Sequence, residues 1–315
     1  MNNRTEDLRP RGISGLASIV VAIAAVLAVY GSPTNVSAAP PNPPAAGKKL
    51  VVLGDSYTAN GVRLDGNEME CRHGPTAWPV QLSHMLNVAG TPDFVDVSCP
   101  GASIQSYTAY NLVHEAWIAD GLGAFGPRTE IIAIQLGMND TWGTSDTMMW
   151  TAMGPCIFNL RDGCELEAAE QGRIPDFRAV TGQEYADRIR AVVDYLTYYA
   201  PNARIVLVGY PELFPAQSNV LCASALGMVP ITQHRGRAVV EYLDRLDRAQ
   251  REAGEILGVH FFDTRATTAG HGLCSAEPWI NGFFDPRADF IGMPFHPTAR
   301  GDAALAAGLR DWIEH

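Results

Sequence analysis

Basic residues are scarce in this chain. Its 315 residues include 23 Lys and Arg against 34 Asp and Glu, which gives a formal net charge of −11 at pH 7. A protein that binds nucleic acid needs a basic surface to neutralise phosphates, so we expect no nucleic-acid partner. Hydrophobic residues make up 47% of the chain and charged residues 18%. This globular balance excludes a fibrous, disordered or multi-span membrane protein.

The six cysteines include no Cys-x-x-Cys motif. Paired short spacings of that kind hold zinc, and the sequence shows no other constellation of metal ligands. We therefore expect neither a metal nor an organic cofactor. An even number of cysteines permits three disulfides in any of fifteen connectivities, and spacing alone does not choose among them.

The N-terminal segment has the three parts of an export signal. Three arginines precede an apolar run over residues 13–30, and small residues follow at 36–39. This order predicts a signal peptide over residues 1–38, cut after Ala38, and a secreted protein. The alternative is a retained N-terminal membrane anchor, because the run approaches the ~18 apolar residues of a membrane span. The arginines are not consecutive, so a twin-arginine signal is not supported.

Export changes the expectations for the rest of the chain. Residues 39–48 contain four prolines and predict an extended tether ahead of one folded domain over residues 49–315. Without residues 1–38, the chain holds 20 basic and 32 acidic residues, a net charge of −12. Disulfides persist outside the reducing cytosol, so export favours paired cysteines.

Short apolar runs alternate with amphipathic patterns after residue 48, without internal repeats. Nearly continuous apolar runs of this length suit strands buried on both faces of a parallel sheet. Apolar stripes at helical spacing are typical of helices packed on a core. The alternation predicts a single α/β sandwich. We expect strands at 49–53, 94–97, 130–136, 203–208 and 259–262, and helices at 78–86, 183–199, 235–257 and 303–313.

Residues 141–180 interrupt this alternation. They hold a cluster of Met and Trp residues, namely Trp142, Met148, Met149, Trp150 and Met153. One interpretation is that these side chains fill gaps in the core. The other is an excursion above the sheet that lines an apolar pocket, since long segments inside compact domains tend to bind ligands.

Chemistry-bearing residues follow the predicted strands, where open α/β sheets bind their ligands. The first strand runs directly into Gly54-Asp55-Ser56. A serine hydroxyl is a weak nucleophile that needs a base to remove its proton. By itself this tripeptide is more typical of a helix cap.

Three further residues change that interpretation. Gly101 follows the second strand, and its N–H can approach a substrate oxygen because no side chain shields it. Asn139 follows the third strand, where its amide can donate to a developing oxyanion. His296 precedes the terminal helix, in a loop that would return beside the first strand. Each residue alone is typical of a turn, a cap or a structural histidine, but their order together indicates a hydrolytic site.

This order resembles the SGNH hydrolase (GDSL esterase/lipase) superfamily over residues 49–315. Further likeness to secreted actinobacterial lipases and esterases comes from the cysteine placement and from Cys71-Arg72, Trp78-Pro79 and Pro278-Trp279-Ile280-Asn281-Gly282. The resemblance implies a flavodoxin-like three-layer α/β/α sandwich with a central parallel sheet. It also implies three sequential disulfides, Cys71–Cys99, Cys156–Cys164 and Cys222–Cys274.

The resemblance also implies roles for individual residues. Ser56 would be the nucleophile and His296 the base. The oxyanion hole would consist of the N–H groups of Ser56 and Gly101 and the amide of Asn139.

The family pattern breaks at Met293, where an Asp or Glu normally stands three residues before the histidine to fix its tautomer. We expect a backbone carbonyl at or near Met293 to orient His296 in a Ser–His dyad, since orientation requires only an acceptor. The alternatives are a carboxylate from Asp285 or Asp289 on the same loop, or a loss of activity.

We therefore predict a secreted, monomeric serine ester hydrolase that forms an acyl-enzyme at Ser56. The Met/Trp-rich stretch favours acyl-lipid esters, with transient contact to a membrane or cell-envelope surface. Acetylated polysaccharide is the second choice, and Tyr57 beside the nucleophile can stack on a sugar or an acyl chain. The rival functions are an acyltransferase or deacetylase acting on envelope glycan or lipid, and a non-catalytic binding module.

Overall fold

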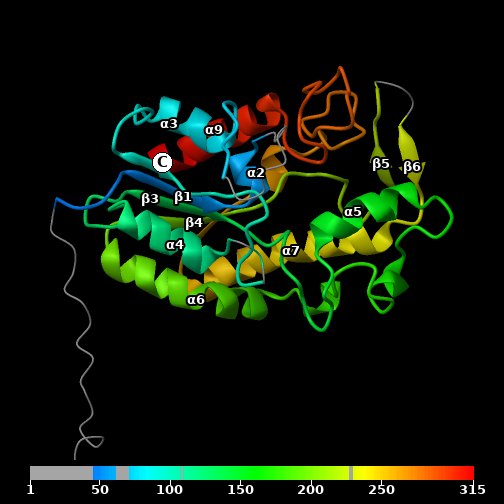
Figure 1. Ribbon diagram of the computed structural model, residues 1–315, viewed down its shortest axis with the longest axis horizontal. Coiled ribbons are helices and arrows are strands. Elements are labelled where there is room, and N and C mark those ends of the chain that lie inside the picture. Colours follow the sequence, from blue (N-terminus) through cyan, green and yellow to red (C-terminus); the bar gives the residue numbers. More distant parts are fainter. Residues whose placement is uncertain (1–44, 62–70, 107, 109, 227–229) are drawn as a thin grey trace, which may run out of the picture. The chain divides into compact units, whose positions relative to one another are not determined.

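The computed structural model describes residues 45–61, 71–106, 108, 110–226 and 230–315 (Figure 1). The predicted signal peptide and residues 39–44 of the predicted tether lie outside them. The Lys48 N–H donates to the Ala124 carbonyl at 2.9 Å, and the Arg128 N–H donates to the Ala46 carbonyl at 3.0 Å. The folded domain therefore begins slightly before residue 49. No helix in the described part of the chain is long and apolar enough to cross a membrane.

A five-stranded parallel sheet forms the centre of the domain, with strand order β2-β1-β3-β4-β7. Its strands are β1 (Leu50–Gly54), β2 (Phe94–Asp96), β3 (Ile131–Gln135), β4 (Arg204–Val208) and β7 (His260–Phe262). All five predicted strands are confirmed. The order reverses between β1 and β3, which is where open sheets of this kind bind ligands beyond the carboxyl ends of the strands.

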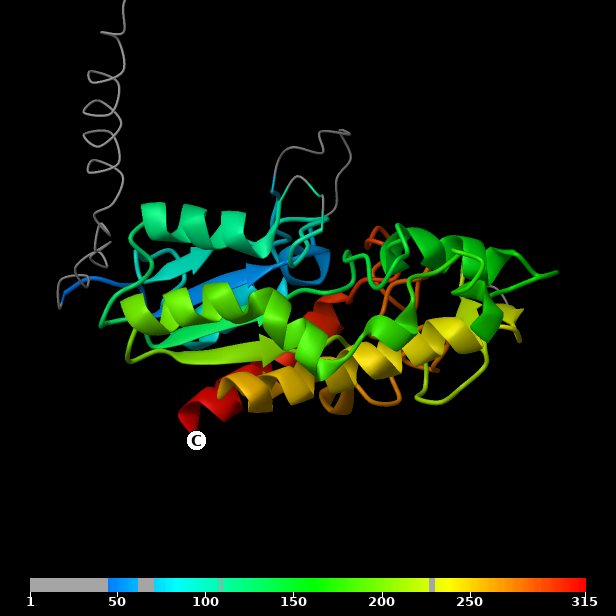
Figure 2. The ribbon, with the colours of Figure 1, turned by 90° about the horizontal axis from the view of Figure 1, so that it is seen from below.

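Helices cover both faces of the sheet (Figures 1 and 2). One face packs against α3 (Trp78–Met85) and α9 (Ala299–Glu314), and the other against α4 (Leu112–Gly121), α6 (Gly182–Tyr199) and α7 (Arg237–Leu257). Alternate residues of β1 enter the two cores, and every residue of β1 and β3 is buried. The predicted three-layer α/β/α sandwich is confirmed.

Capping residues explain where the long helices begin and end. The Thr181 side chain accepts the Glu184 N–H at the start of α6, and the Thr298 side chain accepts the Gly301 N–H at the start of α9. α7 ends at Gly258, whose φ of +68° is a conformation that favours glycine. All four predicted helices are present.

The remaining elements were not predicted. They are α2 (Ser56–Ala59), α4, α5 (Met149–Phe158), α8 (Thr264–Thr267), the 3-10 turns η1 (Leu166–Ala168) and η2 (Phe177–Ala179), and an antiparallel pair of β5 (Leu221–Ala223) with β6 (Ile231–Gln233). α4 carries no visible apolar stripe because Glu115 is buried on it and Trp117 is exposed. α5 contains Pro155, which sequence patterns place outside helices.

Some residues of the Met/Trp cluster in residues 141–180 fill the core, and one lies at the sheet edge near the predicted site. Trp142, Met149 and Met153 are fully buried in the core, and Trp142 Nε1 donates to the Tyr242 hydroxyl at 3.1 Å. Trp150 is only half-buried and its ring lies 4.8 Å from that of His296. Most of the cluster is therefore core, whereas Trp150 lies beside the predicted base.

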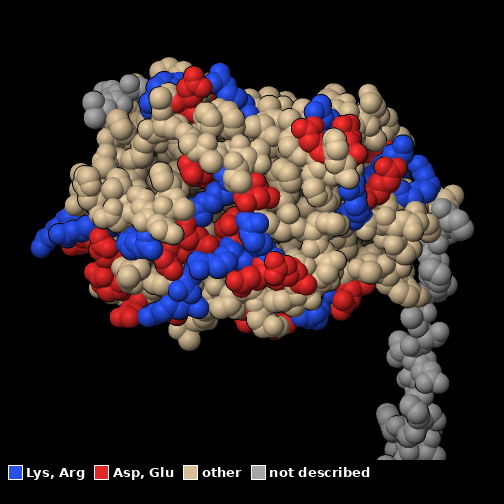
Figure 3. Space-filling view, turned by 180° about the vertical axis from the view of Figure 1, so that it is seen from behind, with Lys and Arg blue, Asp and Glu red and all other residues tan. Residues whose placement is uncertain are grey.

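The six cysteines form three sequential disulfides, Cys71–Cys99, Cys156–Cys164 and Cys222–Cys274, as the resemblance implied. The first holds the segment directly before Gly101, the second the end of α5, and the third joins β5 to the segment after α8. Paired cysteines fit an extracellular protein. Figure 3 shows acidic and basic side chains interspersed on one face, without an extended basic area.

Candidate active site

Ser56 is the first residue of α2, directly beyond the carboxyl end of β1. The side chain of Asp55 caps this short helix by accepting the Tyr57 N–H at 2.8 Å. Gly54 is required by close packing, since a Cβ there would lie 2.2 Å from Thr58 Oγ1. The tripeptide therefore is a helix cap, as its composition suggested, and it also places a serine hydroxyl at the sheet edge.

His296 meets Ser56 at that edge. Its Nδ1 lies 2.9 Å from the carbonyl oxygen of Pro294, and its Nε2 lies 2.8 Å from Ser56 Oγ. A carbonyl oxygen only accepts, so the Pro294 contact assigns the proton to Nδ1. Nε2 is then the unprotonated nitrogen, which accepts the hydrogen bond of the Ser56 hydroxyl.

The predicted orienting group requires a correction by one residue. The Met293 carbonyl accepts the backbone N–H of His296 at 3.1 Å, whereas the Pro294 carbonyl meets the ring. Phe295 between them has a φ of +65°, which turns the chain so that the imidazole folds back onto the carbonyl two residues earlier.

The two alternative carboxylates have other partners. Asp285 is bonded to Arg287 and to the Ser224 hydroxyl. Asp289 accepts the Ala299 N–H at 2.6 Å. Their interpretation as the third member of a triad was wrong, because both carboxylates are used to hold the loop itself.

The imidazole of His296 is fully buried. Burial lowers its pKa to about 4, although the hydrogen bond to the Pro294 carbonyl acts in the opposite direction. A buried imidazole disfavours its charged form because the cation loses hydration. At neutral pH the ring is therefore neutral and able to accept a proton.

Two of the three predicted oxyanion groups, Gly101 and Asn139, come from the loops after β2 and β3. Asn139 is buried, and its Nδ2 donates to the Ala102 carbonyl at 3.0 Å. An amide nitrogen carries two hydrogens, so one remains for a substrate oxygen. Gly101, beside Ala102, has a φ of +85°, which residues with side chains rarely adopt.

Asp140 joins the same two loops. Its carboxylate accepts the Ile104 N–H at 2.9 Å and the Gln105 N–H at 3.3 Å, and Arg188 lies 3.8 Å away. Asn139 and Asp140 therefore both fix the loop that carries Gly101.

Two tyrosines that the sequence did not single out for this role connect the loops of the site. Tyr210, just after β4, donates to Asp55 Oδ2 at 2.5 Å and accepts the Met138 N–H at 3.2 Å. Tyr57 stacks on His296 with ring centroids 4.5 Å apart, and its hydroxyl donates to the Phe295 carbonyl at 2.9 Å. Tyr57 is buried, so the expectation that it stacks on substrate was wrong.

These contacts hold the three loops in one arrangement. Tyr210 connects the loop of Ser56 to the loop of Asn139, and Tyr57 connects Ser56 to the loop of His296. Burial raises the pKa of Asp55 to about 7, although its bond from Tyr210 lowers it. No short motif marks Tyr210, because it lies in the loop after β4, far along the chain from Asp55.

We expect Tyr210→Phe to lower kcat by about tenfold with little change in KM, since a lost buried hydrogen bond costs about 1–3 kcal/mol. The variant removes the bond to Asp55 and the acceptor of Met138 while the ring remains. Steady-state ester hydrolysis and urea unfolding measure the two effects. Tyr185→Phe is the matched control, because the buried Tyr185 hydroxyl donates to the Leu136 carbonyl. Equal kcat values for the two variants would contradict this role.

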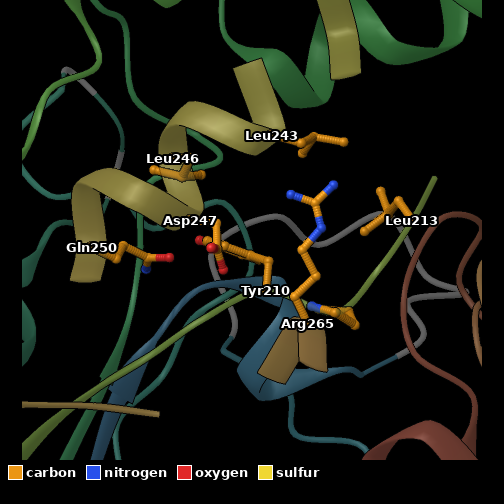
Figure 4. A pocket seen from close by; sticks show the side chains of 8 residues that line it. Tyr210, Leu213, Leu243, Leu246, Asp247, Gln250 and Arg265 are labelled. Carbon is orange, nitrogen blue, oxygen red and sulfur yellow. The ribbon is translucent and has the colours of Figure 1, made fainter. Parts of the chain in front are cut away.

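Two cavities adjoin the site. A cavity of about 10 Å³ lies behind Tyr210, lined in part by Leu246, Asp247 and Gln250 of α7 (Figure 4). Its volume suits about one water molecule and no organic ligand. A second cavity of about 350 Å³ lies beside the histidine loop and is lined in part by Asn60 and Met293. Among the described residues, no group of three or more His, Cys, Asp and Glu side chains could hold a metal ion.

Comparison with known proteins decides the family. The model of the GDSL-like Lipase/Acylhydrolase family matches residues 52–304. The chain belongs to this family. It is a carboxylic ester hydrolase. The resemblance to this family that rested on the order of Ser56, Gly101, Asn139 and His296 is confirmed.

Relatives of this hydrolase match its sequence over most of the chain. Lipase 1 of Streptomyces coelicolor is 26% identical over 94% of this chain and 95% of its own. A lipase of Streptomyces rimosus is 28% identical over 88% and 89%. The crystal structure of phospholipase A1 from Streptomyces albidoflavus is similar in fold, with a TM-score of 0.58 and 21% identity over 85% of this chain and 99% of that one.

Proposed function

We propose that the protein is a secreted serine esterase/lipase in which Ser56 forms an acyl-enzyme and His296 is the base. The observation that carries the proposal is the 2.8 Å contact between His296 Nε2 and Ser56 Oγ, with Nδ1 held by the Pro294 carbonyl. This arrangement of nucleophile, base and orienting acceptor is the one that acyl transfer needs.

The first half of the reaction acylates the enzyme. Ser56 Oγ attacks the ester carbonyl carbon while Nε2 takes the hydroxyl proton. The N–H groups of Ser56 and Gly101 and the amide of Asn139 stabilise the oxyanion. The imidazolium then donates its proton to the leaving alcohol.

The second half uses the same groups on water. His296 takes a proton from water, the hydroxide attacks the acyl-enzyme, and Ser56 recovers its proton as the acid leaves. The Pro294 carbonyl orients the ring in both halves but carries no full negative charge. The dyad therefore depends on orientation more than on a counter-ion for the imidazolium.

An acyl-lipid ester is the substrate class that the surroundings support. Trp150 lies 4.8 Å from His296, and Phe295 precedes it in the chain, so the base has apolar neighbours. The relatives in Streptomyces coelicolor and Streptomyces rimosus are named lipases. We propose lipid esters on these two grounds.

Secretion is supported by the pattern of residues 1–38 and by the three disulfides. The proposed mature protein begins at Ala39 and consists of one catalytic domain, which acts as a monomer without a cofactor. Sequencing the N-terminus of the protein from culture medium checks the cleavage site.

A fluorophosphonate probe tests the chemistry and an ester series tests the substrate. We expect the probe to label Ser56 alone, and p-nitrophenyl esters with chains longer than acetyl to be hydrolysed faster than the acetate. Absence of labelling would refute the serine mechanism. A steep optimum at acetyl would indicate a deacetylase, and ester formation with an added alcohol would indicate an acyltransferase.

A further inference from the structure

The loop that carries His296 exposes three large apolar side chains and buries a carboxylate. Phe284, Phe290 and Ile291 are 54%, 56% and 64% exposed, whereas Asp285 is 1% exposed. This distribution is the reverse of the usual one, in which apolar groups leave water and carboxylates remain in it. An exposed apolar cluster of this kind marks a binding surface.

One pair of opposite charges is neutralised within this loop. Arg287 bonds to Asp285 at 2.7 Å, and its guanidinium holds the pKa of that carboxyl at about 2. Asp289 accepts the Ala299 N–H, and its own N–H donates to Asn281 Oδ1 at 3.1 Å. With one basic and two acidic residues, the loop keeps a formal charge of −1 beside its exposed apolar groups.

One of these exposed aromatic residues has an unusual backbone conformation. Phe284 has a φ of +50°, which bulky residues rarely adopt. Its ring packs on that of Phe290 with centroids 5.8 Å apart. The two exposed rings therefore lie against each other and form one apolar area.

Aromatic contacts connect this surface to the catalytic base. Phe283 packs on Phe295 at 5.4 Å and on Phe158 at 5.6 Å. Phe158 ends α5 and is 44% exposed, and Trp150 of the same helix lies beside His296. We call Phe158, Phe284, Phe290 and Ile291 the apolar rim.

We propose that the apolar rim binds the surface of aggregated zwitterionic lipid and so brings acyl esters to Ser56. This inference rests on the proposed function. Because the rim is uncharged and continuous with the surroundings of His296, it fits a neutral lipid surface that supplies substrate. Such binding gains from apolar burial and is insensitive to salt, unlike attraction to anionic lipid.

Phe290→Ser combined with Ile291→Ser tests the rim. The control is Leu122→Ser combined with Ile256→Ser, which removes two side chains that are 56% and 43% exposed near the amino end of the sheet. The full-length gene is expressed and the secreted protein is sedimented with phosphatidylcholine vesicles at 0.1 M and 1 M NaCl. Hydrolysis of soluble p-nitrophenyl butyrate and of emulsified triglyceride is measured in parallel.

We expect the rim variant to bind vesicles at least tenfold more weakly and to lose emulsion activity in proportion, with butyrate hydrolysis unchanged. The wild type and the control variant should bind equally at both salt concentrations. Vesicle binding equal to that of the control, or binding lost at 1 M NaCl, would overturn the inference. A dimer in gel filtration that the rim variant dissociates would also overturn it, since a second copy would then cover the rim. Butyrate hydrolysis by the wild type tests the proposed function separately.

Discussion

Ser56→Ala will lower kcat for ester hydrolysis by a factor on the order of 10⁵–10⁶, the loss seen when a catalytic nucleophile acting as part of a unit is removed. The variant deletes one hydroxyl, whose partner is His296 Nε2 at 2.8 Å. Asp55 still caps α2 through the Tyr57 N–H, so the fold and the melting temperature should be retained. Hydrolysis of p-nitrophenyl butyrate and a thermal scan measure the two properties.

Ser83→Ala is the control for this variant, because Ser83 is also buried and its hydroxyl donates to the Val80 carbonyl within α3. It should retain full activity. His296→Ala should lose nearly as much activity as Ser56→Ala, and the double variant no more than either, since the two residues act as one unit. A Ser56→Ala enzyme within tenfold of the wild type would exclude an acyl-enzyme at this residue.

The sheet and its long helices could be predicted because their patterns are local. β1 is apolar along its whole length and β3 is apolar up to Gln135, and every residue of both strands is buried. α4 could not be predicted because its core-facing Glu115 accepts the Gly54 N–H at 2.9 Å. That contact joins residues 61 positions apart, so a propensity argument treats Glu115 as an exposed residue.

The groups of the candidate site also fall into those that could be predicted from the sequence and those that could not. Ser56, Gly101, Asn139 and His296 each follow a strand or precede a helix, so their positions at one sheet edge could be inferred from the order of elements. The Pro294 carbonyl could not, because every residue carries one and the choice depends on the positive φ of Phe295. Side-chain identity is read from a sequence, whereas backbone direction is not.

The tyrosine contacts show why the relative placement of the loops could not be predicted from the sequence. Tyr210 reaches Asp55 across 155 residues of sequence, and Tyr57 reaches the Phe295 carbonyl across 238. Nothing in the local sequence of either residue distinguishes these roles from those of a core tyrosine. The mutual placement of the loops is therefore a property of the folded chain that the motifs alone do not encode.

Asn139→Ala should lower kcat by about 10²–10³-fold, the usual cost of removing one oxyanion donor, with KM changed by less than about threefold. The donor is pre-positioned, since one amide hydrogen is held by the Ala102 carbonyl at 3.0 Å. It acts on charge that develops only in the transition state, so the loss appears in kcat and not in substrate binding. Steady-state kinetics separate the two constants.

A structural role for Asn139 would give a different result. The variant also leaves the Ala102 carbonyl without its partner, which costs about 1–3 kcal/mol of unfolding free energy. Asn202→Ala removes a comparable side-chain bond, from Nδ2 to the Pro127 carbonyl at 2.8 Å, away from the site. It should leave kcat unchanged. If Asn139→Ala keeps kcat within threefold of the wild type, the oxyanion is held by the backbone N–H groups alone. If its kcat recovers when unfolding is suppressed at lower temperature, the loss is one of stability and not of transition-state binding.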